Sequence, residues 1–262
     1  MSTPPPWISW NGDAPLVAVA LHHGHDLRDE VAGCMALDSD TRRREEDPWT
    51  GLWASIAETG IVVSRSRFEV DLNRPRELAV YRTPAESWGL DVWKQPLDAG
   101  VVERSLELHT DFYRMVETHL DRLLALHAHV VVLDLHSYNH RRDGEDAPAA
   151  SPAENPGWNV GTGSLDRALF APVVERFLHD LASWERADGE RFDVRENVRF
   201  QGGFLATWLH LRYPGRVCAL AVECKKFFMD EWTGSATAAA LEEPRHALAA
   251  AVPGLLEELV RL

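Results

Sequence analysis

Two histidines follow apolar, strand-like runs of this chain. His136 comes directly after residues 130–135 (VVVLDL), and His22 comes directly after residues 15–21 (PLVAVAL). Because α/β proteins bind ligands and metals at the carboxyl ends of their strands, we expect both rings at one edge of a sheet. A hydrolytic metal site needs about three nitrogen or oxygen ligands and one open position for water. The histidines predict the first two ligands, and the alternative is two hydrogen-bonded histidines at strand ends.

The third ligand has several candidates. His25 lies three residues after His22, and the acidic run Glu45-Glu46-Asp47 ends just before a proline. The acidic run can also be interpreted as a charge cluster that caps a helix beginning near Trp49, because acidic residues favour a helix N-terminus. Spacing alone does not choose between His25 and the carboxylates.

Glu223 ends a third apolar run, residues 217–222. A carboxylate in apolar surroundings has a raised pKa, so it can take a proton from water and later deliver it to a leaving nitrogen. The alternative is a structural ion pair with Lys225 or Lys226. We interpret Glu223 as a candidate general base.

A pair of side chains suited to an anion, Asn73-Arg74, follows an alternating run that starts at Arg67. Arginine binds a carboxylate through two parallel hydrogen bonds, and asparagine can donate alongside it, so the pair fits an anionic substrate or an oxyanion. A plain turn is the alternative. Glycines in residues 159–163 and at 202–203 predict loops where the backbone approaches a ligand or turns tightly.

These candidates need a sheet to bring them together. Apolar runs alternate with helical patterns, which predicts one α/β domain over residues 1–262, with helices on both faces of the sheet. Residues 138–163 lack periodicity and predict a functional loop directly after His136. The expected strands are 15–21, 60–64, 77–81, 129–135 and 217–223, and the expected helices are 99–128, 165–185, 204–211 and 236–262.

Composition limits the classes of partner. The 262 residues carry a formal net charge of −14, which disfavours nucleic acids and anionic membranes because both require a basic face. Three cysteines, with Cys218 and Cys224 in or beside an apolar run, indicate reduced buried thiols and a cytoplasmic protein. No run approaches the roughly 20 apolar residues of a membrane span. A small-molecule partner is expected.

Seven ordered motifs within residues 21–231 resemble the N-formylglutamate amidohydrolase family. More distantly, the chain is similar to the zinc carboxypeptidase and aspartoacylase superfamily, which implies a three-layer α/β/α fold with a central mixed sheet. The implied activity is zinc-dependent hydrolysis of a linear amide on an N-acyl acidic amino acid such as N-formyl-L-glutamate. The motifs are His22-x-Gly24, EEDP (Glu45 to Pro48), RFEVDLNRP (Arg67 to Pro75), DLHS (Asp134 to Ser137), NVGTG (Asn159 to Gly163), RFQGGF (Arg199 to Phe204) and VECKKFFMDE (Val222 to Glu231).

The resemblance also implies roles for single residues. One Zn²⁺ per chain is expected on His22, Glu46 and His136, with Asp47 one step from the acidic position and His25 disfavoured. Another divalent transition metal fits the same ligand types. Glu223 is the implied general base and Arg74 the second catalytic residue. The residues expected to contact substrate are Arg67, Asn73, Arg74, Asn159, Gln201 and Gly202.

One departure concerns the substrate. Family members often carry a lysine before the paired glycines and an arginine after them, whereas this chain has Gln201 and no basic residue across Phe204 to Leu209. The alternatives are a zinc deacylase or carboxypeptidase of the same superfamily, and a non-catalytic carboxylate-binding protein. We expect a monomer or a small homo-oligomer.

Overall fold

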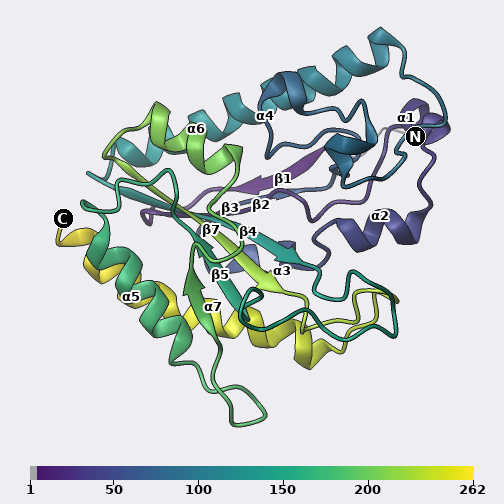
Figure 1. Ribbon diagram of the computed structural model, residues 1–262. Helices are drawn as coiled ribbons and strands as arrows, with labels where there is room; N and C mark the ends of the chain where they lie inside the picture. Colours follow the sequence, from purple (N-terminus) through teal and green to yellow (C-terminus); the bar gives the residue numbers. More distant parts are fainter. Residues whose placement is uncertain (1–4) are drawn as a thin grey trace.

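A mixed sheet of seven strands forms the centre of the computed structural model, which describes residues 5–262 (Figure 1). The strand order is β1-β3-β2-β4-β7-β5-β6, with β1 antiparallel to β3 and β5 antiparallel to β7. The other neighbours pair in parallel. The strands are β1 (Trp7–Trp10), β2 (Leu16–Ala20), β3 (Thr59–Val63), β4 (Val130–Tyr138), β5 (Trp158–Gly161), β6 (Val194–Glu196) and β7 (Val217–Lys225).

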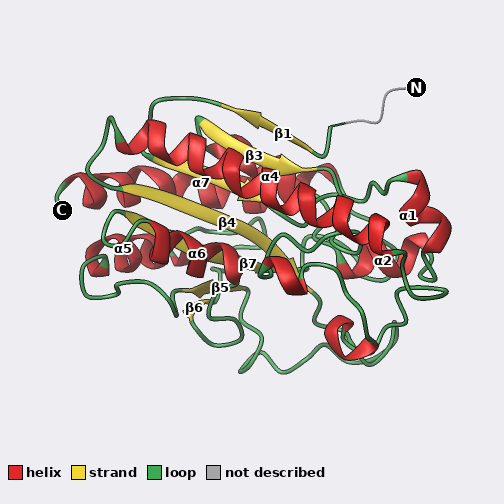
Figure 2. Ribbon diagram, turned by 90° about the horizontal axis from the view of Figure 1, so that it is seen from above, coloured by secondary structure: helices red, strands yellow, loops and turns green. Residues whose placement is uncertain are grey.

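Helices cover both faces of this sheet. Figure 1 shows α4 and α6 on one side and α5 and α7 on the other, and Figure 2 shows α4 lying over the strands. This arrangement confirms the expected three-layer α/β/α architecture. The helices are α1 (Asp29–Cys34), α2 (Ser39–Glu45), α3 (Thr50–Trp53), α4 (Ala99–Leu124), α5 (Ala171–Ala182), α6 (Phe204–Arg212) and α7 (Ala238–Val260), with 3₁₀ turns at Ala54–Ile56, Arg76–Leu78 and Pro84–Ser87.

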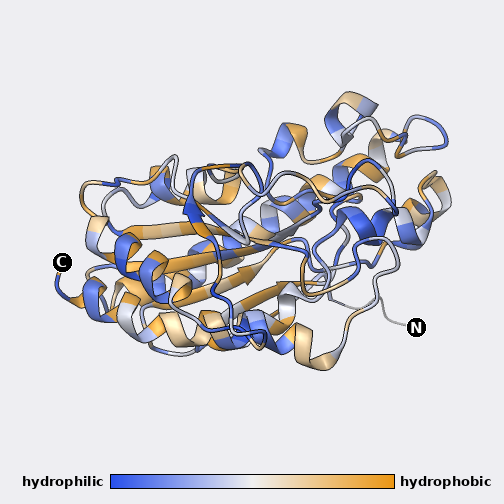
Figure 3. Ribbon diagram, turned by 60° about the horizontal axis from the view of Figure 1, so that its bottom comes forward, coloured by the Kyte–Doolittle hydropathy of each residue, from blue (hydrophilic) through white to orange (hydrophobic). Residues whose placement is uncertain are grey.

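The central strands are apolar on both sides because each side packs on a helical layer. In β2, Leu16 and Ala18 belong to the core under α5 and α7, whereas Val17 and Val19 belong to the core under α4 and α6. Strands buried on both faces need continuous apolar sequence rather than alternation. Figure 3 shows this hydrophobic sheet between helices of mixed hydropathy.

The long helix α4 begins where Asp98 caps it, by accepting a hydrogen bond from the Gly100 N–H at 2.8 Å. Its buried side chains recur at spacings of three and four, for example Val116, Leu120 and Leu123, as expected for a helix with one apolar face. Over residues 5–262, none of the helices combines the length and apolar character of a membrane span.

Two expected segments differ in the structure. Residues 77–81 do not form a strand. Arg76–Leu78 is a 3₁₀ turn, and the apolar Ala79 and Val80 fill the core beneath α4 instead. The alternating run 67–72 forms turns, and β5 and β6 were not predicted. These strands are only four and three residues long, so their pairing with neighbouring strands, rather than their own sequence, defines them.

Candidate metal centre and active site

The carboxyl ends of three parallel strands meet at one cavity of about 370 Å³. His22 follows β2, His136 lies near the end of β4, and Glu223 lies near the end of β7. The pairing register places His136 directly opposite Glu223. All three side chains line the cavity, so the polar ends of the strands that the sequence pointed to do come together.

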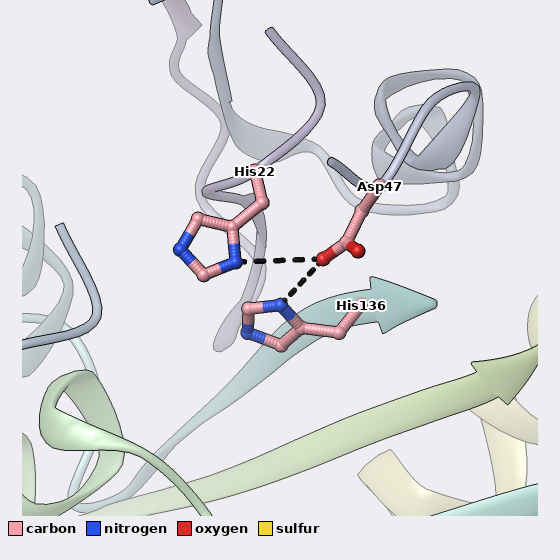
Figure 4. Close-up of side chains that lie close together, drawn as sticks. All are labelled: His22, Asp47 and His136. Atoms are coloured by element: carbon pink, nitrogen blue, oxygen red, sulfur yellow. Dashed lines mark hydrogen bonds and ion pairs between the residues drawn. The ribbon is translucent and has the colours of Figure 1, made fainter. Parts of the chain in front are cut away.

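His22, Asp47 and His136 all line this cavity and form a buried cluster, whose side chains are drawn in Figure 4. Asp47 Oδ2 lies 2.9 Å from His136 Nδ1 and 3.5 Å from His22 Nδ1. One ligand atom from each of the three residues lies within 4.8 Å of the others. Figure 4 shows both rings turning a nitrogen toward the same carboxylate oxygen. Two imidazole nitrogens and one carboxylate therefore converge on one point.

The second nitrogen of each ring faces another buried carboxylate. His22 Nε2 lies 2.8 Å from Asp71 Oδ1, and His136 Nε2 lies 2.9 Å from Asp134 Oδ1. The second contact is an ion-pair contact, because neither oxygen of Asp134 has a hydrogen-bond partner in the described chain. Metal-ligating histidines commonly hold a carboxylate on the ring nitrogen that faces away from the metal, which fixes the ring orientation. Both rings are therefore oriented with Nδ1 toward Asp47.

The cluster fits a divalent cation. Nδ1 of His22 is buried and has no hydrogen-bond partner among residues 5–262, and such an atom is costly unless something coordinates it. Burial would raise the pKa of Asp47, but the hydrogen bond with His136 and the nearby His22 imidazole hold it well below its usual range. Burial would lower the pKa of His136, but Asp134 and Asp47 raise it well above the usual range. Two imidazoles and a carboxylate suit Zn²⁺ and related metals.

Glu46, which the resemblance implied as the third ligand, lies outside this cluster. Its carboxylate accepts a hydrogen bond from the Ser66 hydroxyl and lies 2.6 Å from His25 Nδ1. The Glu46 backbone is extended, at φ −79° and ψ 175°, and successive side chains of an extended chain point to opposite sides. Asp47 therefore faces the histidines while Glu46 faces away, and His25 is held by Glu46.

The backbone that carries Asp47 is anchored from two directions. The Asp47 N–H donates to the His22 carbonyl at 2.8 Å. The Lys226 ammonium donates to the carbonyls of Arg44 and Glu46 at 2.6 and 2.8 Å. Burial lowers the pKa of Lys226 to about 8. Lys226 lines the cavity, but these two carbonyls already hold its amine.

Glu223 has the properties of a proton acceptor. Burial raises the pKa of its carboxyl to about 7, and the nearby charges of Asp47 and Asp134 add to this, while His136 opposes it. The side chain is half-buried because it opens onto the cavity. A carboxyl with a pKa near neutrality can both accept and return a proton at neutral pH.

Asn73 contacts one of the clustered histidines. Its Nδ2 lies 3.3 Å from His136 Nε2, and its Oδ1 accepts a hydrogen bond from the Leu205 N–H at 2.9 Å. The approach is possible because residue 203 is glycine. A Cβ on Gly203 would lie 2.3 Å from Asn73 Nδ2.

Arg67 and Arg74 share one carboxylate in the cavity wall. Arg67 Nη2 lies 2.9 Å and Arg74 Nε 3.5 Å from Asp71 Oδ2. The Tyr81 hydroxyl donates to the same oxygen. The guanidinium of Arg74 also lies 4.7 Å above the Tyr81 ring. Both arginines line the cavity, and Asp71 therefore links these two side chains to His22.

The remaining predicted contacts divide into two groups. Gln201 and Gly202 line the cavity. Asn159 is fully buried and is absent from the cavity wall. Its Oδ1 accepts the Arg199 N–H at 2.8 Å, and its Nδ2 donates to the Phe200 carbonyl at 2.8 Å. Its side chain thus holds the cavity wall in place, in contrast to the expected substrate contact.

Three functional candidates were not identified from the sequence. Asp71 and Asp134 lie two residues before Asn73 and His136 respectively. A carboxylate two residues from a candidate ligand on an extended segment shares its face, and this signal was available for Asp134. Arg199 also lines the cavity, and no spacing rule indicated it.

Comparisons with known proteins identify a matching family and solved structures with a similar fold. A family model described as N-formylglutamate amidohydrolase matches residues 14–228. The crystal structure of N-formylglutamate amidohydrolase from Ralstonia eutropha JMP134 is similar with a TM-score of 0.77 and 16% identity, covering 98% of this chain and 99% of that one. A gene product of Agrobacterium tumefaciens is similar with a TM-score of 0.61 and 18% identity, covering 97% and 93%. No curated protein sequence matches the chain.

Proposed function

The chain belongs to the N-formylglutamate amidohydrolase family, and we propose that it is a metal-dependent hydrolase that cleaves the amide bond of N-formyl-L-glutamate or a closely related N-acyl acidic amino acid. The observation that carries this proposal is the buried cluster of His22, Asp47 and His136 in the same cavity as Glu223. A nitrogen-oxygen metal site beside a free carboxyl is the combination that metal-dependent amide hydrolysis uses.

The metal ligands in this proposal are His22 Nδ1, Asp47 and His136 Nδ1. A bound Zn²⁺ or similar ion would polarise the amide carbonyl and lower the pKa of water. Asp71 and Asp134 keep the two rings oriented from the other side. Carboxylates that contact ligating histidines in this way preserve the ligand geometry of metal sites. Mutation of such a carboxylate typically reduces metal affinity or activity about 10- to 100-fold.

Glu223 is the proposed general base and acid. As a carboxylate it takes a proton from the attacking water, and as a carboxylic acid it gives that proton to the leaving amine. Its pKa of about 7 allows both forms at neutral pH. The products would be formate and the free amino acid.

Asn73 and Arg74 are the proposed contacts to the substrate anion or the scissile carbonyl. Arg74 retains exposure of 27% in its side chain and lines the cavity, so its guanidinium is accessible to a ligand. Arg67 is more deeply placed and holds Asp71 at 2.9 Å. We assign Arg67 mainly to keeping Asp71 and the anion-binding wall in position.

The direct test is release of formate from N-formyl-L-glutamate by protein loaded with Zn²⁺, Co²⁺ or Mn²⁺, compared with chelated protein. N-acetyl-L-glutamate, measured as released acetate, distinguishes a deformylase from a broader deacylase. The proposal predicts metal-dependent formate release that Glu223→Gln abolishes. Absence of any acid product from both substrates, with every metal, would contradict it.

A further inference from the structure

The cavity wall contains an arginine that has no carboxylate partner among residues 5–262. Arg67 and Arg74 both contact Asp71, and Arg142 lies 3.4 Å from Glu45. Arg199 also lines the cavity. Its side-chain hydrogen bond among residues 5–262 goes to a neutral amide, with Nη1 donating to Asn155 Oδ1 at 2.7 Å. A guanidinium without a carboxylate partner at the wall of a cavity can bind the carboxylate of a ligand.

This guanidinium is held in a defined position. It lies 5.4 Å from the ring centroids of both Tyr138 and Phe200, which themselves line the cavity. The amide that accepts from it, Asn155, is 2% exposed. Stacking on aromatic faces orients an arginine without cancelling its charge. Binding of an anion here therefore costs little side-chain entropy, although Arg199 itself is exposed.

The backbone of Arg199 is tied to the strand that neighbours Glu223. Asn159 accepts the Arg199 N–H at 2.8 Å, and the pairing register puts Asn159 directly opposite Glu223. Neighbouring strands are about 4.8 Å apart, and an arginine side chain extends several ångströms farther. Through Asn159, the backbone of Arg199 is held at a fixed position relative to Glu223, the proposed base. The side chains of Arg199 and Glu223 line the same cavity.

We infer that Arg199 binds the side-chain carboxylate of the substrate and so selects N-acyl derivatives of acidic amino acids. This inference rests on the proposed function and deepens it. It also explains how the cavity can select a second carboxylate although residue 201 is glutamine and Phe204 to Leu209 contain no basic residue. A net charge of −14 repels a dianionic substrate in general, so a local cation free of acidic partners has a large effect.

The experiment compares N-formyl-L-glutamate with N-formyl-L-glutamine, which has nearly the same shape and no side-chain charge. We expect the wild type to prefer the glutamate derivative in kcat/KM. Arg199→Gln should lower kcat/KM for N-formyl-L-glutamate about 30- to 100-fold, mainly through KM, and change the value for N-formyl-L-glutamine less than about 3-fold. Arg199→Lys, which keeps the charge but loses the bidentate geometry, should fall between.

The matched control is Arg142→Gln, which removes a cation from the same wall that, unlike Arg199, contacts a carboxylate, that of Glu45 at 3.4 Å. It should leave the ratio of the two kcat/KM values within about 3-fold of wild type. Equal use of both substrates by the wild type, or an unchanged ratio in Arg199→Gln, overturns the inference and leaves the proposed function standing. No formate from either substrate overturns the proposed function and this inference with it. Thermal melting of each variant confirms that it is folded.

Discussion

Replacing Gly203 by alanine should disturb the active site through one contact. Gly203 has an ordinary backbone conformation, with φ −98°, so alanine causes no backbone strain. The added Cβ would lie 2.3 Å from Asn73 Nδ2, 2.4 Å from Oδ1 and 2.5 Å from Cγ. Unbonded atoms of these types rest about 3.5 Å apart, so the Asn73 side chain must retreat by about 1 Å.

The retreat has two consequences that can be estimated. Asn73 loses its hydrogen bond from the Leu205 N–H and its 3.3 Å contact with His136 Nε2. Overpacking of this kind typically lowers the free energy of unfolding by about 1–3 kcal/mol. A displacement of about 1 Å in an active site can reduce activity about 100-fold. We therefore expect kcat/KM to fall far more than the modest loss of stability can explain.

The assay is formate release together with urea unfolding of Gly203→Ala. Gly33→Ala is the matched control, because a Cβ at that position in α1 meets nothing within 4 Å, and its stability should change by less than about 1 kcal/mol with full activity. Wild-type kcat/KM in folded Gly203→Ala would show that Asn73 does not need its observed position, and the assigned role of Asn73 would be wrong.

Three further predictions concern protonation. Glu223→Gln should keep metal content at the wild-type level and reduce kcat at least about 1,000-fold, because the amide cannot accept a proton; loss of metal as well would make Glu223 a ligand instead. Burial raises the pKa of Glu223 to about 7, and the positive charge of a bound metal ion would lower it, so kcat/KM should rise about tenfold per pH unit on the acid side and level off at or below pH 7; a pH profile flat from 4 to 8 would exclude this base. Burial lowers the pKa of His210 to about 4, and its Nε2 accepts the Ala219 N–H at 3.0 Å. Since the folded-state pKa lies below the unfolded value, His210 stabilises the fold above pH 6.5, and urea unfolding should show about 1–2 kcal/mol of this stability lost as pH falls toward 4. His210→Gln should weaken this dependence, and an unchanged pH dependence in that variant would refute the assignment.

The sequence predicted the fold correctly for the strands that are buried on both faces, because burial requires apolar residues there. β2, β4 and β7 are buried strands that begin as continuous apolar runs. The first functional polar residues come directly after β2 and within the carboxyl-terminal halves of β4 and β7. His22, His136 and Glu223 could be picked from the sequence for that reason. Residues 77–81 show that an apolar run does not by itself predict a strand. This short run adopts a turn, and the side chains of Ala79 and Val80 are buried in the core all the same.

The choice between Glu46 and Asp47 could not be made from the sequence. Both are acidic, adjacent and almost completely buried, and only the extended backbone at Glu46 decides which carboxylate faces the histidines. The role of Asp71 depends on turns that bring Arg67 and His22 to the same carboxylate. The Arg67 contact is local, at a spacing of four residues, whereas the His22 contact joins residues 49 positions apart, and no local spacing encodes it.

The most direct test of the metal site is the metal content of three proteins purified in parallel: wild type, Asp47→Asn and Glu46→Gln. Elemental analysis after dialysis should find about one divalent ion per wild-type chain. We expect Asp47→Asn to lose most of the metal, and Glu46→Gln to retain it, because that side chain contacts Ser66 and His25 instead. Loss of metal in Glu46→Gln with retention in Asp47→Asn, or a wild type that binds no metal under any loading condition, would contradict the proposed site.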